Sequence, residues 1–260
     1  MTTTVQTTAT TNVPGDSTNR APMDSTRKTA LVAGVFYLIT FISIPTLALY
    51  GHMKTNPDFI LGSGSDTAVL WGCVLEVIVA LAGIGTAVTL YPVVKRQHEG
   101  AALGFVATRV LEAAMIFTGV VSLVSLVSLR HDLGTAAGAN AASLVTAGAS
   151  HVATYKATFL LGQTLMPCLN ALLLGSLMYK SRLVPRIIPT IGLIGAPLLI
   201  TATFATLLGH NGPTSLWSGL ATLPVAAWEL SLGVWLVVKG FKPSALTALS
   251  LSSNAGPDSS

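Results

Sequence analysis

The stretch from Ala101 to Leu129 is mostly apolar, yet it carries two charged residues, Arg109 and Glu112, near its middle. A helix needs about 20 apolar residues to cross the hydrocarbon core of a bilayer, so this stretch is long enough to span one. Residues three apart share one face of a helix, and a charge at the centre of a membrane helix costs about 2.5 to 3.5 kcal/mol on insertion scales. The pair is therefore expected to face the interior of a bundle, either as a structural clamp or as a working site.

Composition favours a membrane protein over a soluble one. Only 9% of the residues are charged and 51% are hydrophobic, a balance with which a soluble domain would aggregate. The formal net charge is +4, but the basic residues cluster beside apolar segments, which indicates topology signals and no nucleic-acid partner. Cys73 and Cys168 lie inside apolar segments without a Cys-x-x-Cys motif or a Cys/His cluster, which argues against a disulfide framework or a zinc site. We expect a lipid bilayer as partner, no metal and no cofactor.

The predicted fold class is all-α, a six-transmembrane-helix bundle. A polar leader, residues 1–27, is rich in Thr, Ser and Asn and is expected to be disordered, and the tail 241–260 is expected to be loose. The short basic turn Lys95–Gly100 makes the second and third spans antiparallel neighbours. The longest connection, residues 130–154, is rich in Ala and Gly and is expected to hold at most a short interfacial helix. The six predicted spans are residues 28–50, 68–94, 101–129, 155–179, 187–209 and 216–238.

The distribution of Lys and Arg predicts the orientation. If the N-terminus is cytoplasmic, most basic residues outside the membrane fall on the cytoplasmic side, and only Lys54, Arg130 and Lys156 fall on the outer side. This asymmetry is the one that the positive-inside rule describes. Both termini are therefore expected in the cytoplasm, with the chain in the cell membrane as a multi-pass protein.

Counting residues along each span brings several polar side chains to one depth. At about 1.5 Å per residue, Arg109, Glu112, Asn170 and Glu229 lie in a common layer, which we expect to be the intramembrane polar centre. Glu76 belongs to the outer half, where Lys156 is the expected partner. Three intramembrane acids face one intramembrane base, so the excess carboxylates must be protonated, hydrated or matched to a cation.

Three segments resemble a known family of bacterial membrane proteins. They are Arg109-Val-Leu-Glu-Ala, the run from Gly175 to Arg186 with the following Ile191-Gly192, and the closing run from Trp228 to Gly240. They are similar to domain of unknown function 4386, and the resemblance extends from Lys28 to Phe241. It implies a six-span protein of the bacterial inner membrane. It implies no activity, so it assigns no catalytic or ligand-binding residue.

Several functions agree with these patterns. The polar centre suits a structural clamp or proton- or ion-coupled transport of a small solute, and the alternative is a non-catalytic sensory or partner-binding membrane protein. An embedded enzyme is less favoured, because the spans contain no histidine and the chain has neither Gly-x-Ser-x-Gly nor His-Glu-x-x-His. Four histidines on the outer side leave a surface metal or haem site as a minor alternative: His52, His131, His151 and His210. Ligand and oligomeric state stay open.

Overall fold

The structure is a computed structural model that describes residues 24–134, 140–213 and 215–254. Nearly all of the leader that we expect to be disordered lies outside this part of the chain. The described residues form helices and connections without any β-strand. In chain order the elements are α1 (Ser25–Thr40), η1 (Phe41–Ser43), α2 (Thr46–Leu49), α3 (Gly51–Thr55), η2 (Pro57–Leu61), α4 (Asp66–Val94), α5 (Glu99–Gly134), α6 (Ala141–Thr158), η3 (Phe159–Leu165), α7 (Met166–Ser181), α8 (Ile187–Leu207), α9 (Leu216–Val238) and α10 (Pro243–Asn254).

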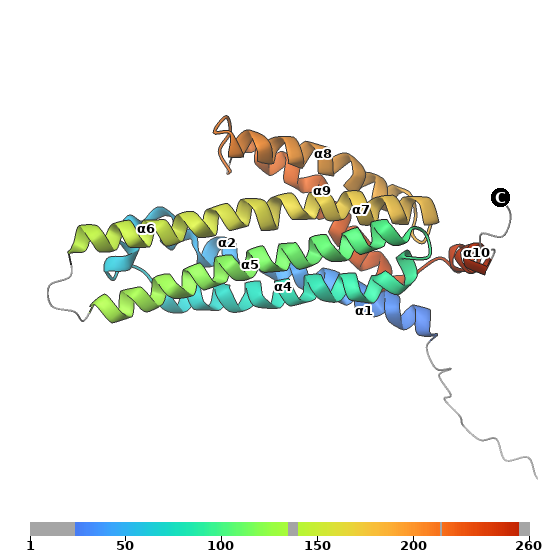
Figure 1. Cartoon of the computed structure of the whole chain (residues 1–260), viewed down its shortest axis with the longest axis horizontal. Coiled ribbons are helices and arrows are strands. Elements are labelled where there is room, and N and C mark those ends of the chain that lie inside the picture. The colour runs from blue at the N-terminus through green and yellow to red at the C-terminus, as the bar shows by residue number, and fades with distance from the viewer. Residues whose placement is uncertain (1–23, 135–139, 214, 255–260) are drawn as a thin grey trace, which may run out of the picture.

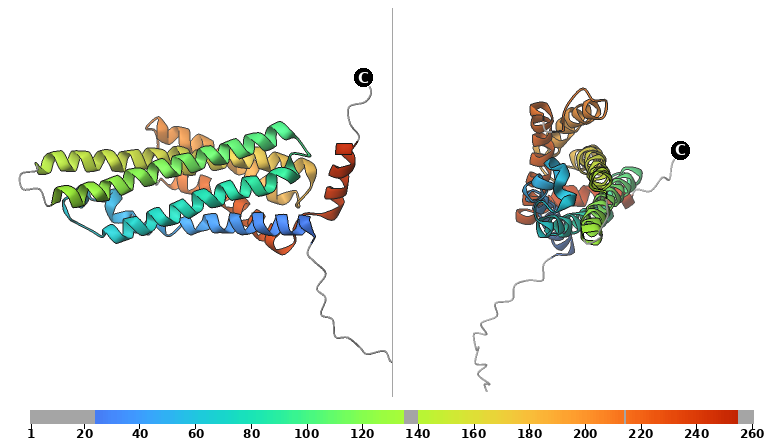
Figure 2. Two further views of the ribbon diagram at one scale, coloured as in Figure 1. Left: turned by 60° about the horizontal axis from the view of Figure 1, so that its bottom comes forward. Right: turned by 90° about the vertical axis from the view of Figure 1, so that its left-hand side faces the viewer.

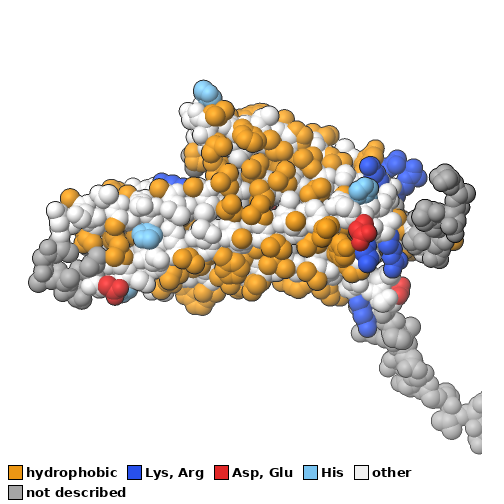
Figure 3. All heavy atoms as spheres, in the orientation of Figure 1, with side chains coloured by type: hydrophobic (Ala, Val, Ile, Leu, Met, Phe, Trp, Pro, Cys, Tyr) orange, Lys and Arg blue, Asp and Glu red, His pale blue; other side chains and the backbone are white. Residues whose placement is uncertain are grey.

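Six helical segments of the described chain are long and apolar enough to cross a membrane, as the hydropathy pattern predicted. Their outward faces carry large apolar side chains such as Val88, Val121 and Leu223, each about 60% exposed, which lipid would cover. On the face drawn in Figure 3, hydrophobic side chains form a broad band along the middle of the molecule. The chain is thus an all-α, multi-pass membrane protein. The spans are Ser25–Leu49, Asp66–Val94, Glu99–Asp132, Ala141–Ser181, Ile187–Leu207 and Leu216–Val238.

Helices α1, α4 and α5 run side by side with the continuous rod formed by α6, η3 and α7 (Figures 1 and 2). Helices α8 and α9 form a hairpin that packs on α7 and α1. Close approach inside this hairpin depends on Gly192, because a Cβ there would lie 2.6 Å from the indole of Trp228. The buried core therefore runs along the axis of the bundle, and the polar side chains of α4, α5, α7 and α9 project into it.

Two of the rods are longer than a bilayer is thick. Helix α5 has 36 residues, about 54 Å at 1.5 Å per residue, against a hydrocarbon thickness of about 30 Å. Helix α6 begins at Ala141, so most of the connection predicted for residues 130–154 is helical. The expectation failed because it used apolar length alone, whereas this alanine-rich segment has a high helix propensity. The projecting ends of α5 and α6 pack against η2. Together with α2, α3 and η2 these two ends form a cap, which we call the outer cap after the orientation that the sequence predicts.

The C-terminal tail is also more ordered than predicted. Residues 243–254 form helix α10, with Pro243 at its first position, where a missing backbone N–H costs nothing. Ala245 and Leu249, four residues apart, are buried against the main hydrophobic core. Helix α10 and the start of α1 lie at the same end of the bundle (Figure 1). Lys and Arg side chains gather at that end (Figure 3).

Candidate functional site

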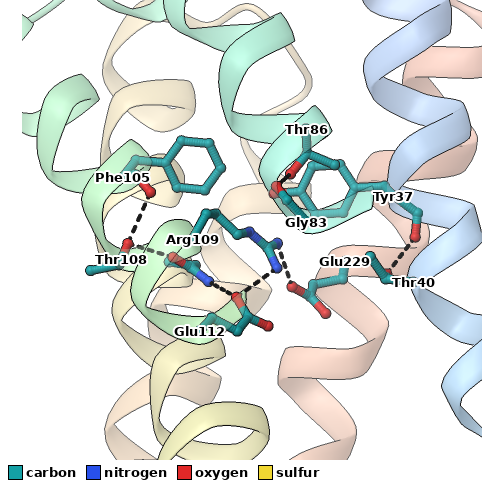
Figure 4. A network of polar contacts seen from close by, with 10 residues as sticks. Tyr37, Thr40, Gly83, Thr86, Phe105, Thr108, Arg109, Glu112 and Glu229 are labelled. Carbon is teal, nitrogen blue, oxygen red and sulfur yellow. Dashed lines mark hydrogen bonds and ion pairs between the residues drawn. The ribbon is translucent and has the colours of Figure 1, made fainter. Parts of the chain in front are cut away.

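Arg109 lies at the centre of a network of charged and polar side chains inside the bundle (Figure 4). Its Nη1 donates to Glu112 Oε2 at 3.0 Å and its Nη2 donates to Glu229 Oε1 at 2.9 Å. Only 2% of the arginine side chain is exposed. Glu112 lies one turn further along α5, and Glu229 comes from α9. The guanidinium therefore joins two spans that are remote in the sequence.

Asn170 extends the network to α7. Its Nδ2 donates to Glu112 Oε2 at 2.7 Å, and its Oδ1 accepts a hydrogen bond from the Thr108 hydroxyl at 2.5 Å. One carboxylate oxygen of Glu112 thus accepts from both Arg109 and Asn170. Hydrogen bonds to the charged form stabilise a carboxylate, so Glu112 is the better-stabilised anion of the network.

The arginine reaches this position because its neighbours leave room and offer ring faces. Gly83 of α4 has no side chain, and a Cβ there would lie 3.9 Å from the arginine Cδ and Nη1. The guanidinium carbon lies 5.3 Å from the ring centre of Tyr37 and 5.8 Å from that of Phe105. Aromatic faces attract a cation electrostatically, and the attraction grows when water is excluded. Helices α1, α4 and α5 therefore enclose the guanidinium, while α5 and α9 neutralise it.

The charges of the network do not balance. One guanidinium contacts two carboxylates, which leaves a net charge of −1 if both acids are ionised. Glu229 has fewer hydrogen-bond partners, because it bonds only to Arg109 among the described residues, and 15% of its side chain is exposed. The Nε of Arg109 is buried without a hydrogen-bond partner among the described residues. Binding of one proton to either carboxylate would make the network neutral as a whole.

Glu76 forms a second polar cluster in the other half of α4, and its partners differ from the predicted one. Glu76 is fully buried, and its Oε1 accepts from the Tyr155 hydroxyl at 2.8 Å and from Gln163 Nε2 at 3.1 Å. Lys156, which we expected there, is exposed and donates to the backbone carbonyl of Lys54 at 3.2 Å. Neighbours in a helix point about 100° apart, so a helix that turns Tyr155 inward turns Lys156 away. That part of the prediction was wrong.

Lys54 of the outer cap lies above this second cluster. Its Nζ is 5.4 Å from the ring centre of Tyr50, 4.9 Å from that of Tyr155 and 5.3 Å from that of Phe159. Burial, the largest cause, lowers the pKa of Lys54, and the nearby charge of Glu76 acts in the opposite direction. Gln163 could have been suspected from sequence as an amide inside an apolar span, but nothing in the sequence links Lys54 to these rings.

The outer-side histidines do not form a metal site in the described residues, where no group of three or more His, Cys, Asp or Glu side chains is placed to hold an ion. His131 instead lies 3.1 Å from Asp66, and His151 lies 3.2 Å from the Ser122 hydroxyl. Cys73 and Cys168 are free and buried on separate spans. The contacts of His131 and His151 are structural ones that account for their positions.

Fold and network together define the class of the protein as a multi-pass helical membrane protein with a buried, ion-paired arginine. A family model described as a domain of unknown function, DUF4386, matches residues 32–240. The chain belongs to this family, as the resemblance of its third, fourth and last spans indicated. Comparison with curated proteins and with solved structures gives no match.

Proposed function

We propose that this chain is a proton-coupled membrane protein that moves a small solute, and that Glu229 is the side chain that gains and loses the proton. The observation that supports the proposal is the charge imbalance of the network, in which Arg109 contacts both Glu112 and Glu229. An intramembrane acid without its own counter-ion is costly, so it is protonated for part of the time. Proton carriers in membranes use acids in this situation.

Glu229 is better suited to proton exchange than Glu112. Glu112 is 10% exposed and accepts two hydrogen bonds on one oxygen, which favour its anion. Glu229 Oε1 accepts one, from Arg109, while its Oε2 has no partner among the described residues and is not buried. A proton can therefore bind at Oε2 of Glu229 without displacing a hydrogen bond. The network is then neutral as a whole.

Protonation of Glu229 would weaken the attraction between α5 and α9. Helix α9 packs with α8 as a hairpin on the rest of the bundle, and Arg109 is its ion-pair partner in the core. When Glu229 is neutral, Arg109 remains paired with Glu112, and the hairpin keeps its apolar contacts and the hydrogen bonds from Arg27 to the carbonyls of α9. A proton-dependent change in the position of this hairpin is the step that would couple proton movement to a solute.

The orientation is part of the proposal. Basic side chains gather at the end of the bundle where α1 begins and α10 lies (Figure 3), so we place this end in the cytoplasm of a bacterial cell, in line with the positive-inside rule. Labelling of single cysteines with a membrane-impermeant maleimide in intact cells tests it. Cysteine in place of Asn211 should react from outside and cysteine in place of Lys180 should not. The reverse pattern would exclude this orientation.

Proton flux in proteoliposomes tests the function directly. The purified protein is reconstituted with a trapped pH-sensitive dye, a membrane potential is imposed, and the rate of internal pH change is measured. The proton flux of the parent protein should exceed that of empty liposomes, and Glu229→Gln should reduce the flux at least about tenfold. Glu99→Gln removes an exposed acid at the start of α5 and is the matched control, with flux unchanged. Equal flux in the parent and in Glu229→Gln would exclude the proposal.

A purely structural role is the second candidate. The observation that favours it is that Arg109, Glu112, Asn170 and Glu229 link α5, α7 and α9 by direct hydrogen bonds. A clamp predicts a stability loss on removal of Arg109 and no proton flux in the parent protein. The flux assay therefore separates the two roles.

A further inference from the structure

We propose that Glu76 is a second proton-binding site in the outer half of the bundle and that Lys54 is its mobile counter-ion. This inference rests on the proposed function, because it supplies the outer site of the same proton pathway. Gly83, where an added Cβ would lie 3.9 Å from the Arg109 side chain, is seven residues beyond Glu76 on α4. Seven residues are two helical turns, so the two sites share one face of α4 and lie about 10 Å apart along it.

Only one of the two carboxyl oxygens of Glu76 has hydrogen-bond partners among the described residues. Its Oε1 accepts two hydrogen bonds, from Tyr155 and Gln163, while its Oε2 is buried without a partner among the described residues. The side chain is 0% exposed. No Lys or Arg of the described chain forms an ion pair with it. A buried carboxyl in this setting holds a proton on its free oxygen, because an uncompensated anion there would carry a large desolvation cost.

Lys54 is a cation without an anion. It forms no ion pair with the described residues, and its ammonium lies against the rings of Tyr50, Tyr155 and Phe159 at 4.9 to 5.4 Å. Tyr155 connects the two groups, since its ring face holds Lys54 and its hydroxyl binds Glu76. A cation without an ion-pair partner thus lies over the ring whose hydroxyl binds an acid without an ion-pair partner. Loss of the proton from Glu76 gives each of them the partner that it lacks.

Lys54 also borders a cavity that is large enough to hold water. It lines a cavity of about 240 Å³ in the outer cap, together with Met53, Leu126, Val152 and Lys156. Lys54 belongs to α3, a helix of five residues between the first span and η2. Such a short helix can shift with little loss of structure. The cavity therefore leaves room for water next to Lys54.

The remaining ionisable groups around Glu76 do not supply a competing counter-charge. Helix α4 contributes the Cys73 thiol, the segment before α3 contributes the Tyr50 hydroxyl, 3.7 Å from that thiol, and α6 contributes Tyr155. Lys156 is the other cation nearby, and it is exposed and bonded to the Lys54 carbonyl. On α5, the charges of Arg109 and Glu112 already neutralise each other. Lys54 is therefore the group that responds when Glu76 ionises.

The proposed step moves one proton. In the resting state Glu76 carries a proton on Oε2 and Lys54 is an ammonium ion on the aromatic faces. The Oε2–H bond breaks and the proton passes to water, which leaves a carboxylate. Lys54 keeps its own protons and moves toward the carboxylate, so the pair becomes neutral. The reverse step loads the site.

The test is infrared difference spectroscopy of the full-length protein in liposomes as pH is varied, which detects the C=O stretch of a protonated carboxylic acid. We expect a titrating band, distinct from that of Glu229, that is lost in Glu76→Gln and shifted in frequency in Glu76→Asp. Lys54→Met removes the counter-ion and should move the titration midpoint up by at least about one pH unit, a tenfold change in acid dissociation constant. Lys54→Arg should keep the midpoint near that of the parent.

Two controls separate this inference from other effects. Lys156→Met removes the neighbouring cation and should move the midpoint by much less than Lys54→Met. Glu229→Gln should leave the Glu76 band in place even if proton flux is lost. A band that does not titrate, or a midpoint unchanged in Lys54→Met, overturns the role of Glu76 and Lys54. A titrating Glu76 with no flux in the parent protein overturns the transport proposal alone.

Discussion

Arg109 and Glu229 are 120 positions apart in the sequence, on α5 and α9, and their side chains meet at 2.9 Å in the interior of the bundle. Glu112 shares the same guanidinium from within α5. The arginine therefore neutralises a local acid and a remote acid at once, and its removal would leave two carboxylates in an apolar interior. This arrangement leads to the first prediction.

Replacement of Arg109 by Met should destabilise the protein by about 3 to 5 kcal/mol, the usual cost of leaving a buried ion pair without one partner. Thermal unfolding of the purified protein in detergent measures the change. Arg109→Lys should lose less stability, because it keeps the positive charge. Some loss should remain, because lysine lacks the planar fork that reaches both carboxylates. The triple variant Arg109→Met, Glu112→Gln, Glu229→Gln should recover part of the loss. A triple variant less stable than Arg109→Met would contradict the electrostatic explanation.

Asn170→Leu should destabilise the protein by about 1 to 3 kcal/mol, since Glu112 loses a donor and the Thr108 hydroxyl loses an acceptor. The matched control is Ser176→Ala, also on α7, where the hydroxyl bonds only to the Leu173 carbonyl of its own helix. That change should stay within about 0.5 kcal/mol. Unfolding in the same detergent compares them, and equal effects would show that Asn170 contributes no more than an ordinary polar side chain.

Much of this architecture is readable in the sequence, because hydropathy and the fixed rise of a helix determine which segments span and at what depth a residue lies. Depth counting placed Arg109, Glu112, Asn170 and Glu229 in one layer, and in the structure they are in hydrogen-bond contact. Their function stays a prediction. The method failed for Glu76, since depth says nothing about the rotation of a helix about its axis. Rotation decides whether Tyr155 or Lys156 points inward.

Neither hydropathy nor helix depth predicts two other features of the structure, the start of α6 and the surroundings of Lys54. The helical start of α6 was overlooked because its alanines are too small to register as a span, although they favour a helix. The Lys54 site joins residues of three elements, the segment before α3, α3 itself and the rod of α6 and η3. No spacing within one element signals such a cluster. Contacts of this kind follow from the way the cap folds back on the bundle.

The α8–α9 hairpin gives a packing prediction. A Cβ at Gly192 would lie 2.6 to 2.9 Å from three atoms of the Trp228 indole, and Trp228 is only 1% exposed, so neither side can yield easily. Gly192→Ala should therefore destabilise the protein by about 1 to 3 kcal/mol through overpacking. Gly219→Ala on α9 is the control, since a Cβ there meets nothing within 4 Å and alanine favours the helix. Thermal unfolding of both variants is compared. Equal stability of the two would show that the hairpin can open at no cost.

The stability of the protein should depend on pH through Lys54, which lies in the outer cap and outside the spanning segments. Burial lowers the pKa of Lys54 below its ordinary value of 10.5, so the unfolded chain binds more protons than the folded protein between the lowered pKa and 10.5. Stability should therefore rise with pH across that window and fall as pH drops through it. Lys54→Met should remove this contribution, whereas Lys156→Met, which removes an exposed cation, should keep it. Melting temperatures of the three proteins across the window measure the effect, and the difference between parent and Lys54→Met cancels the titration of tyrosines. Parallel pH curves for parent and Lys54→Met would show that burial of this ammonium has no energetic consequence.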